Sequence, residues 1–143
     1  MPKVEEFSRK MVERTLDDMN VRYLRDKDGD FVALFGEDEK AGCEIRLHVI
    51  ITGSRNQILR AAMLSDADVR SVDAGLLYRV CNTWNREHRW PRAYVDGDGD
   101  IVLEEYVDLD KGIHQELLRD FMLTVMATGF QFWRWAHNEQ GLF

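Results

Sequence analysis

The sequence contains little cysteine, no long apolar run and no excess of positive charge. Cys43 and Cys81 are the only cysteines among its 143 residues, so we expect reduced core residues of a cytoplasmic protein and no disulfide. No apolar run approaches the roughly 20 residues that a membrane helix requires. The opening stretch, MPKVEEFSRK, lacks the apolar segment of a signal peptide, so we expect none.

A formal net charge of −7 makes the chain acidic. Acidic proteins repel phosphate backbones and anionic lipid headgroups, so we expect neither a nucleic acid nor a membrane as partner. The composition is otherwise that of a globular chain, with 45% hydrophobic and 31% charged residues. We expect one domain over residues 1–143, with a core large enough to need no disulfide.

Hydrophobic periodicity divides the first half of the chain into one helix and four strands. Residues 3–19 predict a helix, because five apolar side chains recur near helical spacing: Val4, Phe7, Met11, Leu16 and Met19. Alternation between turn signals predicts strands at 21–25, 31–35, 43–51 and 57–65. The third of these strands has one apolar face, formed by Ile45, Leu47, Val49 and Ile51.

The second half predicts two helices and two strands. The helices are expected at 72–88 and 113–140, and the strands at 92–96 and 101–107. Asp73 is the expected N-cap of the first helix, Pro91 follows its end, and Gly129 is expected to kink or end the last helix. The order α-β4-α-β2-α, with a mostly antiparallel sheet packed against helices, predicts an α+β fold.

Two Asp- and Gly-rich stretches, DKDGD at 26–30 and DGDGD at 96–100, resemble calcium loops. Neither has the glycine that an EF-hand loop requires at its sixth position, and both separate predicted strands. We therefore interpret them as hairpin turns, with Asp98 and Gly99 as the central pair of the second. A two-residue turn predicts three cross-strand pairs: Val95 with Val102, Tyr94 with Leu103, and Arg92 with Glu105. A protein that responds to divalent cations through these turns remains the alternative.

The sequence contains no recognisable catalytic or metal-binding motif. The four histidines are far apart, and none has metal-ligand spacing with a cysteine or another histidine. There is no G-x-S-x-G nucleophile motif and no Gly-rich loop for a nucleotide. We therefore predict no catalytic residues, no metal and no cofactor, and an unrecognised enzyme remains a further alternative.

Two groups of aromatic and amide side chains are candidates for structural or binding roles. The sequence NTWN places Asn82 and Asn85 on one side of a helix beside Trp84, and we favour hydrogen bonds from both asparagines to a neighbouring backbone over contact with a ligand. The tail carries four further aromatic candidates, Phe132, Trp133, Trp135 and Phe143. They form either an exposed surface for a protein partner or a cluster that packs back onto the fold.

The chain resembles the YbjN family of bacterial sensory-transduction regulators over nearly its whole length, most closely from residue 82 to residue 113. The residues that carry the resemblance are Asn82, Trp84, Asn85, Trp90, Pro91, Tyr94, Val95, Gly99 and a glycine before the last helix. The resemblance implies a fold like that of type III secretion chaperones. It also implies a cytoplasmic, non-enzymatic and often homodimeric protein that binds a segment of a protein partner, in a regulatory or chaperone-like role. The family offers no catalytic residues to transfer.

Overall fold

A computed structural model describes residues 3–143; Pro2, which directly precedes the predicted helix at residues 3–19, lies outside them. Three helices and six strands form within these residues. In chain order they are α1 Arg9–Asp18, β1 Leu24–Arg25, β2 Phe31–Asp38, β3 Cys43–Thr52, β4 Ile58–Ser65, α2 Ala74–Glu87, β5 Arg92–Val95, β6 Ile101–Asp108 and α3 Gln115–Asn138. The α+β class predicted from the sequence is confirmed.

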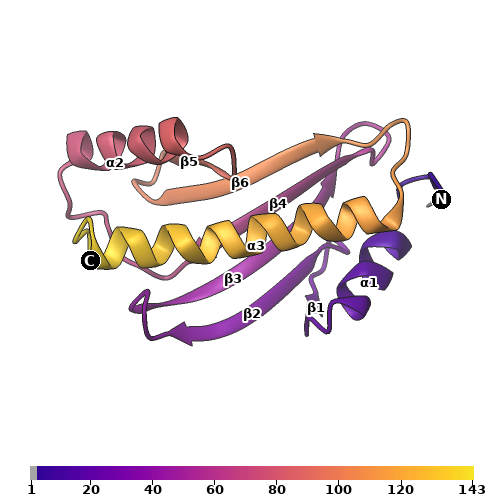
Figure 1. Cartoon of the computed structure of the whole chain (residues 1–143), viewed down its shortest axis with the longest axis horizontal. Helices are drawn as coiled ribbons and strands as arrows, with labels where there is room; N and C mark the ends of the chain where they lie inside the picture. Colours follow the sequence, from indigo (N-terminus) through magenta and orange to yellow (C-terminus); the bar gives the residue numbers. More distant parts are fainter. Residues whose placement is uncertain (1–2) are drawn as a thin grey trace.

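All six strands belong to one antiparallel sheet with the order β1-β2-β3-β4-β6-β5. Helix α3 lies along one face of this sheet and contacts β4 and β6, and α1 packs beside it near the β1 edge (Figure 1). Helix α2 contacts β5, the strand at the opposite edge. Within residues 3–143 no helix covers the second face of the sheet, which we call the open face.

Alternation along β3 shows which side chains belong to each face. The residues directed at α3 are almost fully buried, namely Cys43, Ile45, Leu47, Val49 and Ile51. The residues between them are exposed or half-buried and include Arg46 and His48. The apolar face predicted for this strand is therefore confirmed, because a strand that is covered on one side needs apolar residues at every second position.

The first helix is shorter than predicted, because it begins only after Ser8. The Ser8 side chain caps the helix by accepting a hydrogen bond from the backbone N–H of Met11. Val4, predicted to lie on the apolar stripe, is 58% exposed. The preceding segment is extended instead, and Glu5 forms an isolated bridge with Ile113.

Helix α3 continues through Gly129, so the predicted kink or end at this residue is wrong. Gly129 is buried against Met63 of β4, and a Cβ atom at Gly129 would lie 2.6 Å from Cβ of Met63. The glycine therefore allows the helix to approach the sheet closely. A helical pattern alone does not distinguish such a packing glycine from a helix end.

The predicted register of the β5–β6 hairpin is wrong by one residue. The observed pairs are Val95 with Ile101, Tyr94 with Val102, Ala93 with Leu103, and Arg92 with Glu104. The loop contains the three residues 97–99, and Gly99 adopts a φ of +84°. A three-residue loop that ends in a left-handed residue is a common hairpin geometry, and it shifts the pairing by one position relative to a two-residue turn.

Each Asp/Gly turn is organised by its first aspartate. Oδ1 of Asp96 accepts hydrogen bonds from the backbone N–H groups of Asp98 and Asp100, at 2.9 and 3.0 Å. Asp26 binds the N–H groups two and four residues ahead of it at the same distances. These bonds are the local turn chemistry that favours aspartate in tight loops, and they direct the first carboxylate of each motif at its own backbone.

Candidate functional site

Helix α2 covers the β5 edge through Asn85. Its Nδ2 donates to the backbone oxygen of Ala93, and its Oδ1 accepts from the N–H of Ala93, both at 2.9 Å. These bonds occupy backbone groups that an edge strand would otherwise present to another chain. The backbone-bonding role predicted for Asn85 is confirmed. The same prediction is wrong for Asn82, because its exposed side chain forms no hydrogen bond with a neighbouring backbone within residues 3–143.

The remaining motif residues lie around the same junction. Trp84 is buried, and its Nε1 donates to the backbone oxygen of Pro91 at 2.8 Å. Gly99 lies in the hairpin loop, and Tyr94 lies on the open face beside Arg92. These residues join α2 to the β5–β6 hairpin and do not enclose a common cavity.

The aromatic tail does not form one exposed surface. Phe132 is 0% and Trp133 is 2% exposed, so the interpretation of these two as an accessible binding surface is wrong. Phe132 packs edge-on against Trp84 of α2, whereas Trp133 faces the sheet, where its Nε1 donates to the backbone oxygen of Met63. This half of α3 is covered by the sheet and by α2, so it buries side chains in two directions. Trp135 and Phe143 are half-buried beside this cluster.

The other half of α3 borders an apolar groove of about 380 Å³. We call it the α3–β6 groove; it is lined by Trp90, Glu105, Tyr106, Val107, Leu117, Asp120, Phe121, Thr124 and Val125. Three of these apolar side chains are large and exposed: Trp90, Tyr106 and Leu117, the last of them 50% exposed. An exposed cluster of large apolar side chains is typical of a binding surface.

The groove exists because β5 is shorter than β6. Strand β5 pairs only with Ile101–Glu104, whereas the remaining residues 105–108 of β6 pair with β4 on one side alone. Within residues 3–143 no strand pairs with their outer side. Four extended residues provide about 13 Å of strand edge, on which backbone N–H and C=O groups are available for pairing.

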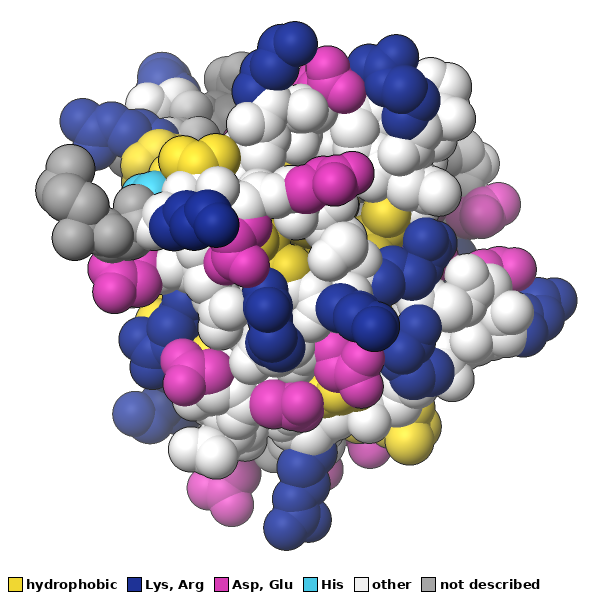
Figure 2. Space-filling view, turned by 90° about the vertical axis from the view of Figure 1, so that its right-hand side faces the viewer, with side chains coloured by type: hydrophobic (Ala, Val, Ile, Leu, Met, Phe, Trp, Pro, Cys, Tyr) yellow, Lys and Arg dark blue, Asp and Glu magenta, His cyan; other side chains and the backbone are white. Residues whose placement is uncertain are grey.

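The charged residues that line the groove are both acidic. They are Glu105 on β6 and Asp120 on α3. Burial raises the pKa of Glu105, and the neighbouring charge of Glu104 adds to this increase. Around the end of the molecule where α3 begins, Lys and Arg side chains alternate with Asp and Glu, and hydrophobic side chains are visible in the hollows between them (Figure 2). The groove is therefore apolar with negative charge at its rim.

A row of polar side chains crosses the open face of the sheet. This open-face stripe consists of Arg46, His48, Arg60, Glu104 and Arg92. Glu104 is only 1% exposed, and its two carboxylate oxygens bind Arg60 Nε and Arg92 Nη2. Burial by itself would raise the pKa of Glu104, but the hydrogen bonds from Arg60, Tyr94 and Arg92 hold this pKa below its usual value.

The other end of the stripe contains a neutral histidine between two arginines. Arg46 Nε donates to His48 Nε2 at 3.1 Å. Burial lowers the pKa of His48, and the positive charges of Arg46 and Arg60 lower it further. At neutral pH the imidazole is therefore uncharged, with its proton on Nδ1.

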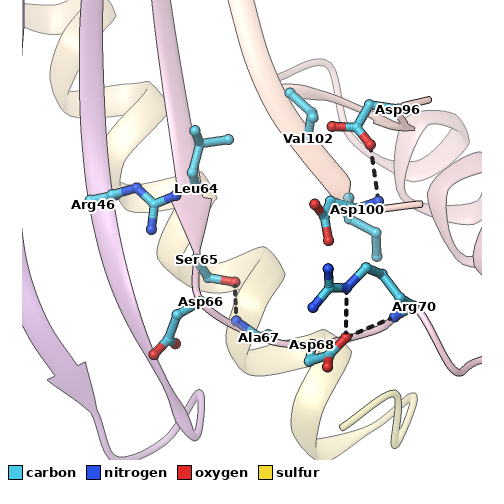
Figure 3. A pocket seen from close by; sticks show the side chains of 11 residues that line it. Arg46, Leu64, Ser65, Asp66, Ala67, Asp68, Arg70, Asp96, Asp100 and Val102 are labelled. Atoms are coloured by element: carbon cyan, nitrogen blue, oxygen red, sulfur yellow. Dashed lines mark hydrogen bonds and ion pairs between the residues drawn. The ribbon is translucent and has the colours of Figure 1, made fainter. Parts of the chain in front are cut away.

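A polar cleft of about 340 Å³ lies beside Arg46, next to the β5–β6 loop (Figure 3). Three of its charged groups are bound locally: Arg70 Nε donates to Asp68 at 3.2 Å, and Asp96 is turned toward the N–H of Asp100. Within residues 3–143, no group of three or more His, Cys, Asp or Glu side chains is arranged to hold a metal ion.

Neither cysteine has the properties of a nucleophile. Cys43 and Cys81 are both buried and free. Burial raises the pKa of each thiol to about 11, so both are protonated at neutral pH.

None of the helices in residues 3–143 combines the length and the apolar character needed to cross a lipid bilayer.

The fold defines an α+β protein with one antiparallel sheet, one covered face and a partly open edge. The chain belongs to the YbjN family, described as "Putative bacterial sensory transduction regulator", whose profile matches residues 8–137. The crystal structure of YbjN from E. coli is similar, with a TM-score of 0.75 at 11% identity over 96% of this chain and 97% of that one.

An uncharacterized protein from Methanothermobacter thermautotrophicus is also similar in structure. Its TM-score is 0.55 at 14% identity, over 88% of this chain and 94% of that one. A search of curated protein sequences found no match. At these identities the two solved structures establish the fold alone.

Hydrophobic periodicity alone does not indicate that the groove residues Trp90, Tyr106 and Leu117 form a surface. A usable signal was present, because the strand predicted at 101–107 is longer than its partner at 92–96. A longer partner strand leaves an unpaired edge. Which side chains border that edge depends on the position of α3, which the sequence pattern does not specify.

Proposed function

We propose that this protein is a non-enzymatic regulatory protein that binds a segment of a partner protein in the α3–β6 groove. The observation that carries the proposal is the combination of exposed apolar side chains with the unpaired edge at residues 105–108. An extended peptide that pairs with a strand edge gains backbone hydrogen bonds, and adjacent apolar pockets select its side chains.

The chemistry of the groove favours a partner segment with apolar and basic residues. Trp90, Leu117 and Phe121 offer apolar contact to alternate side chains of an extended strand. Glu105 and Asp120 complement a lysine or arginine in the segment and disfavour an acidic one. Binding an extended segment of another protein in this way is a chaperone-like activity.

We further propose that the protein is cytoplasmic and forms a homodimer, as the family resemblance implies. The two free cysteines support a reducing compartment. Leu24 and Leu34, exposed on β1 and β2 at the far edge of the sheet, provide apolar surface away from the groove. Light scattering tests the dimer: the proposal expects twice the 16.8 kDa of one chain, reduced to one chain in Leu34→Asp.

The groove is tested by capture of partners from native cytosol with two matched variants. Leu117→Asp places a charge in the groove, and Tyr78→Asp places the same charge at an exposed apolar position on α2. The proposal expects a protein that is retained by the wild type and by Tyr78→Asp and is lost in Leu117→Asp. Equal retention by both variants would show that the groove is not the binding surface.

A further inference from the structure

The unpaired end of β6 directs the backbone groups of only two residues outward. In an antiparallel ladder, successive residues of a strand direct their N–H and C=O groups to opposite sides. The N–H of Asp96 donates to the backbone oxygen of Asp100, so the even-numbered residues of β6 point toward β5. The N–H of Leu109 donates to the segment that precedes β4, so the odd-numbered residues point toward β4. The groups left without a sheet partner within residues 3–143 are therefore those of Tyr106 and Asp108.

Side chains at this edge alternate between the two sides of the sheet. Tyr106 and Asp108 lie on the open face, whereas Glu105 and Val107 face α3 and line the groove. Directly opposed residues of neighbouring strands place their side chains on the same face. Every second residue of a strand added here therefore enters the groove, one opposite Val107 and one opposite Glu105.

These two positions in the groove differ in chemistry. Helix α3 begins beyond the end of β6 and runs back along the sheet, so Leu117, near its start, lies toward Val107 (Figure 1). A side chain opposite Val107 therefore meets apolar surface. A side chain opposite Glu105 meets a carboxylate, and Asp120 provides a second carboxylate in the same groove.

Glu105 lacks the ion pairs of its neighbour in the strand. Two arginines bind the carboxylate of Glu104, whereas neither Glu105 nor Asp120 takes part in an ion pair within residues 3–143. Burial raises the pKa of Glu105, although the positive charge of Arg92 acts to lower it. A segment laid over Glu105 removes more water from this carboxylate, which costs free energy unless the segment supplies a cation.

A second copy of the chain would not supply that cation. Two β6 edges that paired about a two-fold axis at Val107 would place Tyr106 of each copy opposite Asp108 of the other. The acidic residues of both grooves would then meet along one seam. Like charges at an interface disfavour association, so the charge of the groove favours a basic partner over self-pairing.

We propose, resting on the proposed binding of a partner segment in the groove, that the segment adds to β6 as an antiparallel strand in which an apolar residue is followed two positions later by lysine or arginine. The apolar side chain lies opposite Val107, and the basic side chain lies opposite Glu105. The segment continues the line of β5 in a sheet whose five strand pairs are all antiparallel, and antiparallel pairing is the more stable arrangement per residue.

NMR titration of the whole protein with four peptides tests this order of residues. The peptides have capped ends and identical Gly-Ser flanks, and their centres are Thr-Ile-Thr-Lys, Lys-Thr-Ile-Thr, Thr-Ile-Lys-Thr and Thr-Ile-Thr-Gln. The first has the proposed order, the second reverses it, the third moves the lysine to the open face, and the fourth removes the charge. We expect the first peptide to bind at least about fivefold more tightly than each of the others.

Matched variants locate the basic side chain. Glu105→Gln should weaken binding of the Thr-Ile-Thr-Lys peptide about fivefold and leave the Thr-Ile-Thr-Gln peptide unaffected. Glu39→Gln removes the same charge at an exposed position between β2 and β3, and should change neither affinity. Leu117→Asp, in the groove, should weaken binding of both peptides.

Hydrogen exchange of single backbone amides tests the geometry of pairing. The N–H groups of Tyr106 and Asp108 should exchange rapidly in the free protein, because they have no sheet partner there. The Thr-Ile-Thr-Lys peptide, at about ten times its Kd, should slow both about tenfold. The N–H of Val107, which points toward β4, should change little.

The outcomes separate the residue order from the function of the groove. Equal affinity of the first and third peptides, tightest binding of the second, or slowed exchange at Val107 alone would overturn the inference. The groove would keep its function if Leu117→Asp still weakened binding of these peptides. No binding of any peptide at about 1 mM would overturn the inference, and would overturn the groove function as well if Leu117→Asp also lost no partner from cytosol.

Discussion

The two faces of the sheet bury their central side chains by different physical means. On the covered face, Trp133 is enclosed by apolar neighbours and uses its single polar atom in one hydrogen bond to Met63. On the open face, Glu104 is equally inaccessible, but it is enclosed by the charged side chains of Arg60 and Arg92. The covered face therefore holds its centre by apolar burial, and the open face holds its centre by charge-assisted hydrogen bonds.

The largest expected effect is the loss of Trp133 from the covered face. Trp133→Ala should lower the free energy of unfolding by about 3–5 kcal/mol, because it leaves a large cavity between α3 and the sheet. Leu117→Ala, on the same helix but in the groove, should cost less than about 1 kcal/mol. Urea unfolding of both variants measures the difference. Comparable costs would contradict the assignment of Trp133 to stability and of Leu117 to binding.

The next effect distinguishes two adjacent glutamates on opposite faces. Glu104→Gln should lower the free energy of unfolding by about 2 kcal/mol, because two charge-assisted hydrogen bonds lose their ionised acceptor. Glu105→Gln should have little effect or stabilise slightly, because burial already disfavours the ionised form of Glu105. Urea unfolding of both variants measures the difference. A larger loss of unfolding free energy in Glu105→Gln than in Glu104→Gln would reverse our assignment of the two glutamates to the faces of the sheet.

Acid should weaken the fold through carboxylates that are bound by arginines. The pKa of Asp38 is lowered by its hydrogen bonds to Arg134 on α3, and the pKa of Glu104 is lowered by its bonds to arginines on the open face. Both folded-state values lie below the unfolded values of about 4, so the unfolded state takes up protons first as the pH falls. The stability that the two ionised carboxylates contribute is fully present above their pKa in the unfolded chain. It is lost as the pH falls through their lower pKa in the folded protein.

Urea unfolding at a series of pH values between about 7 and 3 measures this loss. Glu104→Gln should make the decline below about pH 4 shallower, and Asp38→Asn should do the same independently, because the two pairs lie on opposite faces. An unchanged acid profile in both variants would show that these ion pairs are not what makes the fold sensitive to acid.

The smallest effect concerns the turn that sets the register of the open face. Asp96→Ala should cost about 1 kcal/mol, because its carboxylate accepts two backbone hydrogen bonds in the β5–β6 loop. Asp98→Ala should cost little, because Asp98 contributes only its backbone N–H to these bonds. Thermal unfolding of the two variants, with and without calcium, measures both stability costs. A calcium-dependent rise in the melting temperature that Asp98→Ala abolishes would favour the cation-binding alternative.

Much of the fold could be predicted from the sequence, because strand alternation and helical spacing are local properties. The apolar face of β3 is such a case, since every second residue must face the same helix. The hairpin register was mispredicted because DGDGD permits both a two-residue and a three-residue loop, and only the second uses Asp96 to bind the loop backbone. Local composition does not decide between them.

The binding surfaces were harder to predict, because they depend on how elements far apart in sequence pack. The aromatic tail contains a high density of large side chains, and α2 and the sheet bury them from opposite sides. The groove forms where β6 extends beyond β5 and α3 lies alongside. Asn85 forms the predicted backbone hydrogen bonds, but Asn82 in the same helix does not, so an asparagine within a helix does not by itself reveal which backbone it contacts.

Site-specific photocrosslinking tests the central claim, that the α3–β6 groove binds a partner segment, most directly. A photoreactive amino acid is placed at Leu117 in one protein and at Tyr78 in another, because both positions are exposed on helices and only Leu117 lines the groove. In native cytosol, we expect Leu117 to crosslink to an apolar segment that carries basic residues, and Tyr78 not to crosslink to it. Crosslinking of the same segment from Tyr78 alone, or no crosslink from Leu117, would contradict the account.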